Sequence, residues 1–278
     1  MKLPTQKLDV KLTAFDLDDT LLSDDLSIHP DNKVALQRCA EQGIYTVLCS
    51  GRADDAVLPY IRTLNIAGTQ YGRYFVSMNG ASVFDLHKRI QIYGRTVSSS
   101  VLQKAYALAR ERGLSAEVYD GSSIIASDKN EWTSIDAKLT GMTLQIPEVF
   151  EKILEKEFPK MIIPGEPQLL LTLQDEFKKE FGSRAVIFIS KPYFLEVMPP
   201  ACGKGEALLW LANELGIDRN QTMAFGDSMN DESMLRGVYH SVAMTNGLDY
   251  LKQISRYETR KDNNHAGVAD FLNAFVLA

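Results

Sequence analysis

The fold is decided by one short stretch, Leu12-Thr13-Ala14-Phe15-Asp16-Leu17-Asp18-Asp19-Thr20-Leu21-Leu22, in which an apolar run meets three carboxylates within four positions. The residues from Val10 to Phe15 are aliphatic, β-branched and aromatic over a short span, which is typical of a buried strand rather than a helix. The carboxylates therefore follow the carboxyl end of that strand, where ligands bind in open parallel α/β sheets. A turn or cap built from aspartates is the structural alternative that this stretch leaves open.

Length and composition are those of an ordinary globular protein. The chain has 278 residues, 45% of them hydrophobic and 24% charged, so one domain with a large insertion and two domains are both compatible with it. The net charge is −6, and no run of Lys or Arg is long enough to form a nucleic-acid or anionic-membrane surface. We therefore expect neither nucleic acid nor membrane as a partner.

The same composition bears on the cellular compartment. No apolar stretch approaches the roughly 18 to 20 residues that span a bilayer, and the first residues lack the apolar segment of a signal peptide. The three cysteines Cys39, Cys49 and Cys202 show neither CxxC spacing nor a disulfide framework. These observations predict a cytoplasmic protein.

The chain alternates strands and helices at both ends. After the acidic stretch, a helix is expected from Pro30 to about Gln42 and a second buried strand from Ile44 to Cys49, which together form a parallel crossover unit. The pattern returns late in the chain, with expected strands at 194–198, 222–225 and 240–244 and helices at 204–215 and 267–275. We therefore predict a doubly wound, Rossmann-like parallel α/β core.

A different pattern occupies the middle of the chain. We expect a helix at 98–112, a hairpin at 115–119 and 123–127, a polar segment, a helix near 147–158, a strand at 168–173, a helix at 175–181 and a strand at 184–189. This order predicts an inserted α+β domain at about 86–190, between core segments at 1–85 and 191–278.

Polar groups stand at several predicted strand ends and at one helix start: Asp16, Asp18, Ser50, Lys204 and Asp227. Because the carboxyl ends of parallel strands share one edge of the sheet, we expect these groups to converge. Carboxylates in close proximity favour a hard cation such as Mg²⁺, while a hydroxyl, an ammonium and backbone N–H groups suit a phosphoryl group. Asn230 and Asp231 follow Asp227 closely and join this set.

The motifs around these residues resemble those of the haloacid dehalogenase (HAD) superfamily, in its Cof-like branch (HAD-IIB) with an inserted type C2 cap. The resemblance rests on four segments in order, Phe15–Leu22, Cys49–Arg52, Gly203–Leu208 and Gly226–Asp231, and on three lesser landmarks, 79–81, 242–246 and 267–269. It extends over essentially the whole chain after residue 10. Three positions depart from the usual pattern: Asp19 and Thr245 each replace a common Gly, and the segment 201–203 differs before the lysine.

The resemblance implies a role for each motif residue. Asp16 is implied as the nucleophile that forms an aspartyl-phosphate, and Asp18 as the acid and base for the leaving oxygen and the attacking water. Mg²⁺ is implied between the Asp16 carboxylate, the main-chain carbonyl of Asp18 and Asp227. Ser50 and Gly51 are expected to contact the phosphoryl group.

The remaining implied roles concern charge balance and loop shape. Lys204 is expected to offset charge between nucleophile and phosphate. Asp231 is expected either to bind the metal through water or to hold Lys204, and Asn230 either to contact phosphate or to shape its loop. For Asn79, Asn230 and Asn246, a turn-forming role and a ligand contact both stay open.

The function implied by the resemblance is Mg²⁺-dependent hydrolysis of phosphomonoesters of small metabolites, with sugar phosphates as the leading class. A phosphotransferase or phosphomutase using the same intermediate, and a non-catalytic sensor of phosphorylated ligands, are the alternatives. The expected partner is a small phosphorylated metabolite, and the expected oligomeric state is a monomer or weak homodimer. Four residues of the insertion are candidates for substrate contact: Trp132, Tyr119, Glu131 and Lys191.

Overall fold

The computed structural model describes residues 2–121 and 123–277, which form two compact units. The first unit comprises the chain up to Gly51, Val57–Tyr93 and the chain from Gly203 onward. The second comprises Arg52–Ala56 and Gly94–Cys202. The domain limits that we predict at residues 86 and 190 stay a proposal.

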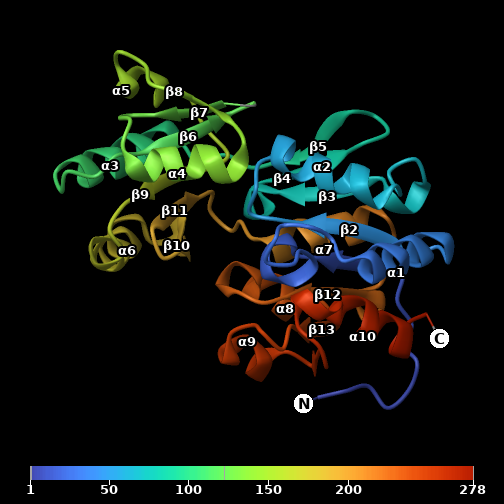
Figure 1. Cartoon of the computed structure of the whole chain (residues 1–278). Coiled ribbons are helices and arrows are strands. Elements are labelled where there is room, and N and C mark those ends of the chain that lie inside the picture. Colours follow the sequence, from blue (N-terminus) through green and yellow to red (C-terminus); the bar gives the residue numbers. More distant parts are fainter. Residues whose placement is uncertain (1, 122, 278) are drawn as a thin grey trace. The chain divides into compact units, whose positions relative to one another are not determined.

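The first unit contains an eight-stranded sheet with the strand order β14-β13-β12-β1-β2-β3-β4-β5 (Figure 1). The strands from β14 to β3 are parallel, and β4 runs antiparallel to β3. Their bounds are β1 Leu12–Phe15, β2 Tyr45–Cys49, β3 Tyr74–Ser77, β4 Ser82–Asp85, β5 Ile90–Gly94, β12 Thr222–Gly226, β13 His240–Ala243 and β14 Tyr257–Glu258. The predicted doubly wound α/β core is confirmed.

Helices cover both faces of this sheet, as Figure 1 shows. Their bounds are α1 Pro30–Glu41, α2 Asp54–Leu64, α7 Lys204–Glu214, α8 Glu232–Gly237, α9 Asp249–Ile254 and α10 Gly267–Phe275. Phe15 of β1 packs in a core with residues of α1, α2 and α10, whereas Leu12 and Ala14 pack with residues of α7 and α8. Alternate side chains of a strand point to opposite faces, so this short strand is buried on both sides.

Strand register brings the motif segments together. Phe15 lies opposite Leu48 of β2 and opposite Phe225 of β12, and the Phe15 and Phe225 rings stack with centroids 5.3 Å apart. Asp16, Ser50 and Asp227 therefore leave three adjacent parallel strands at the same edge. The expected convergence of strand ends at one edge is what the register produces.

The second unit contains a six-stranded mixed sheet with the order β10-β11-β9-β6-β7-β8. Its strands are β6 Glu117–Asp120, β7 Ser123–Ala126, β8 Thr143–Gln145, β9 Met161–Pro164, β10 Val186–Lys191 and β11 Phe194–Met198. Its helices are α3 Ser99–Arg110, α4 Glu131–Thr140, α5 Phe150–Ile153 and α6 Pro167–Phe181. One sheet face packs on α3 and α6 around an aliphatic and aromatic core. The expected α+β insertion is thus present as the cap domain of this fold.

Two expectations for this unit are wrong. The segment Gln168–Leu173 is not a strand: it belongs to the single helix α6, which Pro167 begins. Leu170, Leu173 and Phe177 recur at helical spacing and are buried, whereas Leu169 and Leu171 are exposed, so the leucine run follows a helical and not an extended pattern.

The helix expected near 147–158 is shortened to Phe150–Ile153, and the polar segment before it contains an unexpected helix, α4. Among residues 2–121 and 123–277, none of the helices combines the length and the apolar character that a membrane span requires.

Candidate active site

Asp16 and Asp227 are buried side by side because they follow the neighbouring strands β1 and β12. The Asp16 N–H continues the ladder by donating to the Phe225 carbonyl at 3.1 Å. Only 3% of Asp16 and 7% of Asp227 is exposed. The Thr20 hydroxyl donates to Asp227 Oδ1 at 2.8 Å, so the stretch after β1 also fixes the carboxylate after β12.

Lys204 brings an ammonium into the same place. It is the first residue of α7 and is fully buried, and its Nζ donates to Asp16 Oδ1 at 2.5 Å and to Asp231 Oδ1 at 2.6 Å. Gly80 of the turn after β3 has φ +92°, and a Cβ there would lie 2.0 Å from the Gly203 carbonyl oxygen. Only glycine permits so close an approach of two backbone segments, so the turn packs directly against the backbone immediately before Lys204.

Asp231 is held by both of its oxygens. Oδ1 accepts from Lys204, and Oδ2 accepts from the N–H groups of Asp227 and Ser228 at 2.9 and 3.2 Å. These bonds fold the segment after β12 back on itself. Asp231 therefore determines the position of the ammonium and of the Asp227 loop together.

The charges of this cluster do not cancel. With all three carboxyls ionised, Asp16, Asp227 and Asp231 would carry three negative charges against one positive charge on Lys204, an excess of two. Burial, then the charge of Asp231, raises the pKa of Asp16 to about 7, with Lys204 opposing the shift. Burial, then Asp231 and Asp16, likewise raises the pKa of Asp227 well above its usual range.

For the pKa of Lys204, the neighbouring charges outweigh the effect of burial. Burial lowers the pKa of its ammonium, but the carboxylates of Asp16 and Asp231 outweigh burial and raise it above its usual value. Lys204 is therefore cationic at any physiological pH.

The carboxylates have the chemistry of a metal site. Asp16, Asp227 and Asp231 each offer an oxygen, and these oxygens lie within 4.8 Å of one another. Buried hard oxygen donors that outnumber the one internal cation fit a divalent cation, which favours their ionised forms. The donor set thus agrees with the metal site expected of this fold.

Ser50 and Gly51 extend the cluster beyond β2. Ser50 is fully buried, its N–H donates to the Val76 carbonyl, and its carbonyl accepts from the Asn79 N–H, each at 3.0 Å. A Cβ on Gly51 would lie 2.8 Å from Asn79 Oδ1. Glycine at position 51 therefore leaves the room that the Asn79 side chain occupies.

Asn230 and Asn79 are linked by their amides. Asn230 Nδ2 donates to Asn79 Oδ1 at 3.0 Å, and Asn230 Oδ1 accepts from the Ser228 hydroxyl at 2.7 Å. Asn79 is only 2% exposed and adopts a left-handed conformation with φ 52°. In this structure both asparagines shape the loops that flank Ser50 and Asp227.

Asp18 and Asp19 form the turn that follows Asp16. Asp18 has extended dihedral angles, and Asp19 has φ 59° and ψ 6°, in the left-handed region. This conformation suits glycine, and aspartate is one of the few other residues that tolerate it. Asn246 Nδ2 donates to the Asp19 carbonyl at 2.7 Å and holds the turn.

Three contacts that position the site are not predictable from the motifs alone. Thr20 binds Asp227, Asn246 binds the Asp19 carbonyl, and Gly80 contacts the backbone before Lys204. Thr20 lies inside the first motif. Its hydroxyl stands close in sequence to three carboxylates, and this could have indicated that it binds a carboxylate of the site. The other two contacts join residues too far apart in sequence for any local pattern to reveal them.

The candidate substrate-contact residues of the second unit have varied surroundings. Tyr119 is 3% exposed and its hydroxyl donates to Asp136, whereas Glu131 is exposed at the start of α4. The Trp132 ring stacks on Tyr193 with centroids 6.0 Å apart. Lys191 is the last residue of β10.

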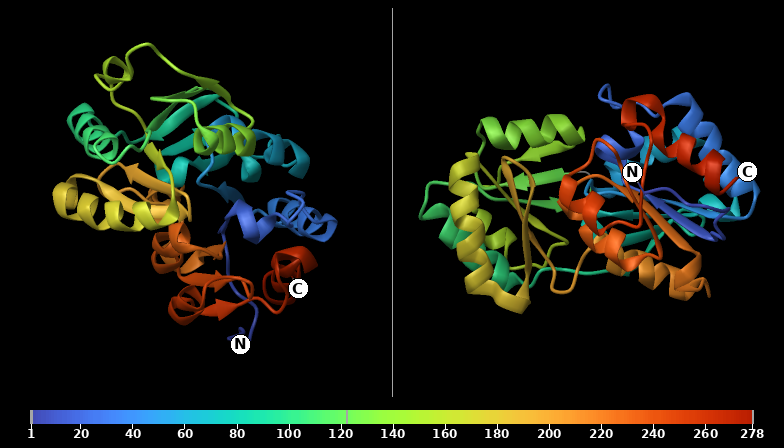
Figure 2. Two further views of the ribbon diagram at one scale, coloured as in Figure 1. Left: turned by 60° about the vertical axis from the view of Figure 1, so that its left-hand side comes forward. Right: turned by 90° about the horizontal axis from the view of Figure 1, so that it is seen from below.

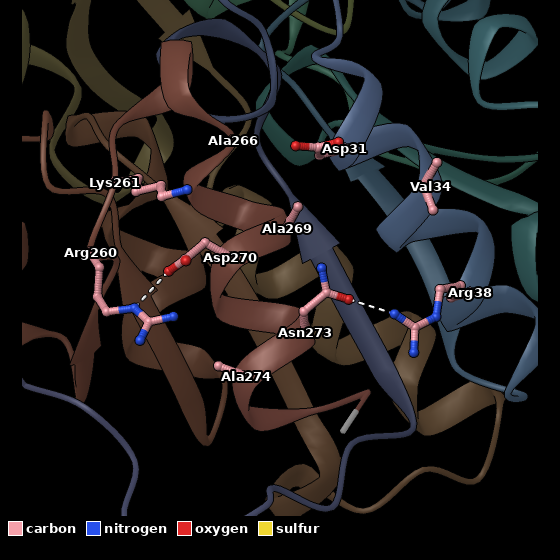
Figure 3. Close-up of a pocket in the computed structure, with 10 residues that line it drawn as sticks. All are labelled: Asp31, Val34, Arg38, Arg260, Lys261, Ala266, Ala269, Asp270, Asn273 and Ala274. Atoms are coloured by element: carbon pink, nitrogen blue, oxygen red, sulfur yellow. Dashed lines mark hydrogen bonds and ion pairs between the residues drawn. The ribbon is translucent and has the colours of Figure 1, made fainter.

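A groove of about 470 Å³ lies elsewhere in the first unit, between α1 and α10. Figure 3 shows its two pairs of bonded side chains, Arg38 with Asn273 and Arg260 with Asp270, at 2.7 Å each. None of the ten residues that line it belongs to the carboxylate cluster. The groove is therefore a separate surface feature.

Comparison with known proteins agrees with this geometry. The family model described as haloacid dehalogenase-like hydrolase matches residues 13–272. A Streptococcus pyogenes serotype M6 protein named "Putative phosphatase" is 32% identical over 274 residues, which cover 97% of this chain and all of the relative. The 5-amino-6-(5-phospho-D-ribitylamino)uracil phosphatase of Bacillus subtilis is 27% identical, and the match covers 96% of this chain and 98% of that protein.

A solved structure gives the same result. A haloacid dehalogenase-like hydrolase from Bacteroides thetaiotaomicron superposes with a TM-score of 0.86 at 29% identity, covering 95% of this chain and 99% of that one. The predicted resemblance is confirmed over nearly the whole length. The chain belongs to the haloacid dehalogenase-like hydrolase family and is an enzyme of its phosphatase branch.

Proposed function

We propose that the protein hydrolyses phosphomonoesters of small metabolites, with Mg²⁺ as cofactor and an aspartyl-phosphate on Asp16 as intermediate. The observation that carries the proposal is the sharing of one buried ammonium, Lys204, by Asp16 and Asp231 beside Asp227. A nucleophilic carboxylate must remain ionised while a phosphate approaches it, and Lys204 supplies the charge that permits this.

In the first step, an oxygen of Asp16 attacks phosphorus and the bond from phosphorus to the leaving oxygen breaks. Asp18 donates the proton that the leaving oxygen needs. In the second step, Asp18 removes a proton from water as the water oxygen attacks phosphorus, which releases inorganic phosphate and regenerates the Asp16 carboxylate. Splitting hydrolysis in this way replaces one difficult displacement by two easier ones.

The metal site would be formed by Asp16, the main-chain carbonyl of Asp18 and Asp227. Mg²⁺ bound there supplies positive charge that neutralises the developing charge on the phosphoryl oxygens. Ser50 and the Gly51 N–H would donate to the same oxygens. Asp231 would act by holding Lys204, since its oxygens are already engaged by the ammonium and two backbone N–H groups.

We further propose phosphorylated polyols and sugars as the leading substrate class. Support comes from the Bacillus subtilis relative, whose named substrate carries its phosphate on a ribityl chain. Specificity would lie in the second unit.

A screen of phosphorylated metabolites with Mg²⁺ tests the proposal, with phosphate release as the readout. We expect turnover of at least one sugar or polyol phosphate by the wild type, loss of turnover in Asp16→Asn, and loss after EDTA treatment that added Mg²⁺ reverses. Asp9→Asn, an exposed substitution outside the site, is the matched control. Full activity in Asp16→Asn, or activity indifferent to EDTA, would refute the mechanism.

A further inference from the structure

The helix α4 of the second unit docks through polar groups. All ten residues of α4 are described, and the two that are buried are Thr133 and Asp136. By contrast, α3 and α6 lie against the opposite face of the same sheet, as Figure 2 shows. They bury leucines and phenylalanines there. Burial of apolar area therefore contributes much less to the docking of α4 than to that of its neighbours.

The polar contact centres on Asp136. The Tyr119 hydroxyl donates to Asp136 Oδ2, and the charge of Asp136 also acts on the nearby carboxyl of Glu117. Glu117 and Tyr119 are two positions apart on β6 and so project from the same face of the sheet. Asp136 thus joins α4 to Tyr119, on the strand face that also carries Glu117.

The buried carboxyl of Glu117 requires a proton. Glu117 is fully buried, and no N–H or O–H group of residues 2–121 and 123–277 donates to either of its oxygens. An ionised carboxylate that is buried without a hydrogen-bond donor is very costly. Asp136, by contrast, accepts from the Tyr119 hydroxyl, which opposes the rise that burial causes in the pKa of Asp136. Glu117, which has no such donor, is therefore the carboxyl group that carries the proton.

The surrounding charges agree with this assignment. Burial, followed by the negative charge of Asp136, raises the pKa of Glu117 well above its usual range. The nearby cation Lys160 opposes the shift, but its Nζ lies 3.5 Å from Glu196 Oε2 and 4.7 Å from the centre of the Tyr119 ring. Lys160 thus pairs with Glu196, and its charge offsets only part of the rise in the pKa of Glu117.

We propose that the neutral carboxyl of Glu117 is a proton-dependent latch that holds α4 on the second sheet. When the carboxyl loses its proton to solvent, Glu117 and Asp136 become two neighbouring anions in a buried site. Because the two buried residues of α4 are polar, apolar burial compensates little for this repulsion, and α4 detaches from β6. Because α4 carries Glu131 and Trp132, the latch would couple pH to the position of two candidate substrate-contact residues.

The sign of the pH dependence follows from the raised pKa of Glu117. Docking is strongest at a pH below the ordinary value of 4.5 and weakens as pH rises toward the pKa of the docked state. Over that interval the opening equilibrium of α4 should increase about tenfold per pH unit, since one proton is released on opening. Above the docked-state pKa the increase should level off.

Hydrogen–deuterium exchange of the full-length protein between pH 5 and 8 tests the latch, after correction for the intrinsic exchange rate. In the wild type, protection of residues 131–140 should fall about tenfold per pH unit up to the pKa of the docked Glu117 carboxyl and then level off, while that of α3 stays constant. Glu117→Gln, which is neutral at every pH, should remove this slope. Glu131→Gln, on the exposed side of the same helix, should retain it.

An equal slope in wild type and Glu117→Gln, or no slope in the wild type, would overturn the proposal. If Glu117→Gln does not fold, the carboxyl carbon-13 resonance of Glu117 in the wild type decides the question. A neutral carboxyl at pH 7 supports the latch, and an ionised one refutes it. Neither readout depends on phosphatase activity. A failure of the latch proposal can therefore be distinguished from a failure of the proposed function.

Discussion

Lys204 and Asp231 form a buried ion pair with an Nζ to Oδ1 distance of 2.6 Å, and the second oxygen of Asp231 accepts from the Asp227 N–H. The same Nζ binds Asp16. One ammonium therefore connects the proposed nucleophile to the loop that carries another candidate metal ligand. This connection makes the charge of Lys204 essential to the stability of the site as well as to its chemistry.

Removing that ammonium should unfold the site. Lys204→Met leaves three buried carboxylates with no internal cation, so we expect the free energy of unfolding to fall by about 3–5 kcal/mol in metal-free buffer. Urea denaturation measures the change. In the control Lys252→Met, which removes a partly exposed pair with Asp249, the loss should stay below about 1 kcal/mol. Similar losses in the two variants would contradict the role of Lys204.

Binding of Mg²⁺ should stabilise the fold through the carboxylates. At a concentration one hundred times its dissociation constant, a ligand that binds one site of the native state adds about 2.7 kcal/mol. We expect thermal denaturation of EDTA-treated wild type to shift upward with Mg²⁺, and the shift to disappear in Asp227→Asn. An unchanged shift in that variant would place the cation elsewhere.

The close approach of Gly80 to the Gly203 carbonyl should be intolerant of a methyl group. Gly80→Ala adds both left-handed strain and a clash with backbone, so we expect at least a tenfold loss of kcat/KM as Lys204 is displaced. Gly113→Ala is matched for strain, since Gly113 has φ +70° but nothing within 4 Å of its Cβ position. It should lose about 1 kcal/mol of stability and no activity. Equal effects would mean that strain alone matters at Gly80.

Asp19 should be dispensable for the chemistry although it stands between Asp18 and Thr20. Its left-handed backbone suits glycine, so Asp19→Gly should leave kcat/KM within about twofold and should not reduce the melting temperature. Steady-state kinetics beside Asp16→Asn makes the comparison. A large loss of activity in Asp19→Gly would assign Asp19 a catalytic role that the proposed division of labour excludes.

Local patterns predicted the core sheet well because its strands are short, apolar and followed at once by polar residues, as at Phe15–Asp16 and Phe225–Asp227. They failed for α4, whose buried positions are the polar residues Thr133 and Asp136, so its sequence lacks the usual apolar stripe. They also failed for α6, where adjacent leucines concealed the helical spacing of the buried ones.

Some residues of the site were predictable from the sequence, and others were not. The residues that leave strand ends, Asp16, Ser50 and Asp227, were predictable because parallel strands share an edge. The contacts from Asn246 to the Asp19 carbonyl and from Gly80 to Gly203 were not. They depend on how loops remote in sequence pack, which no single segment specifies.

The most direct test of the central claim is to trap the intermediate on Asp16. The wild-type enzyme, mixed with Mg²⁺ and a substrate from the metabolite screen, is quenched in acid during turnover, and its peptides are examined by mass spectrometry. We predict one additional phosphoryl group on the peptide that contains Asp16, and none in Asp16→Asn. Steady turnover with no phosphorylated peptide, or with the phosphoryl group on another residue, would contradict the account.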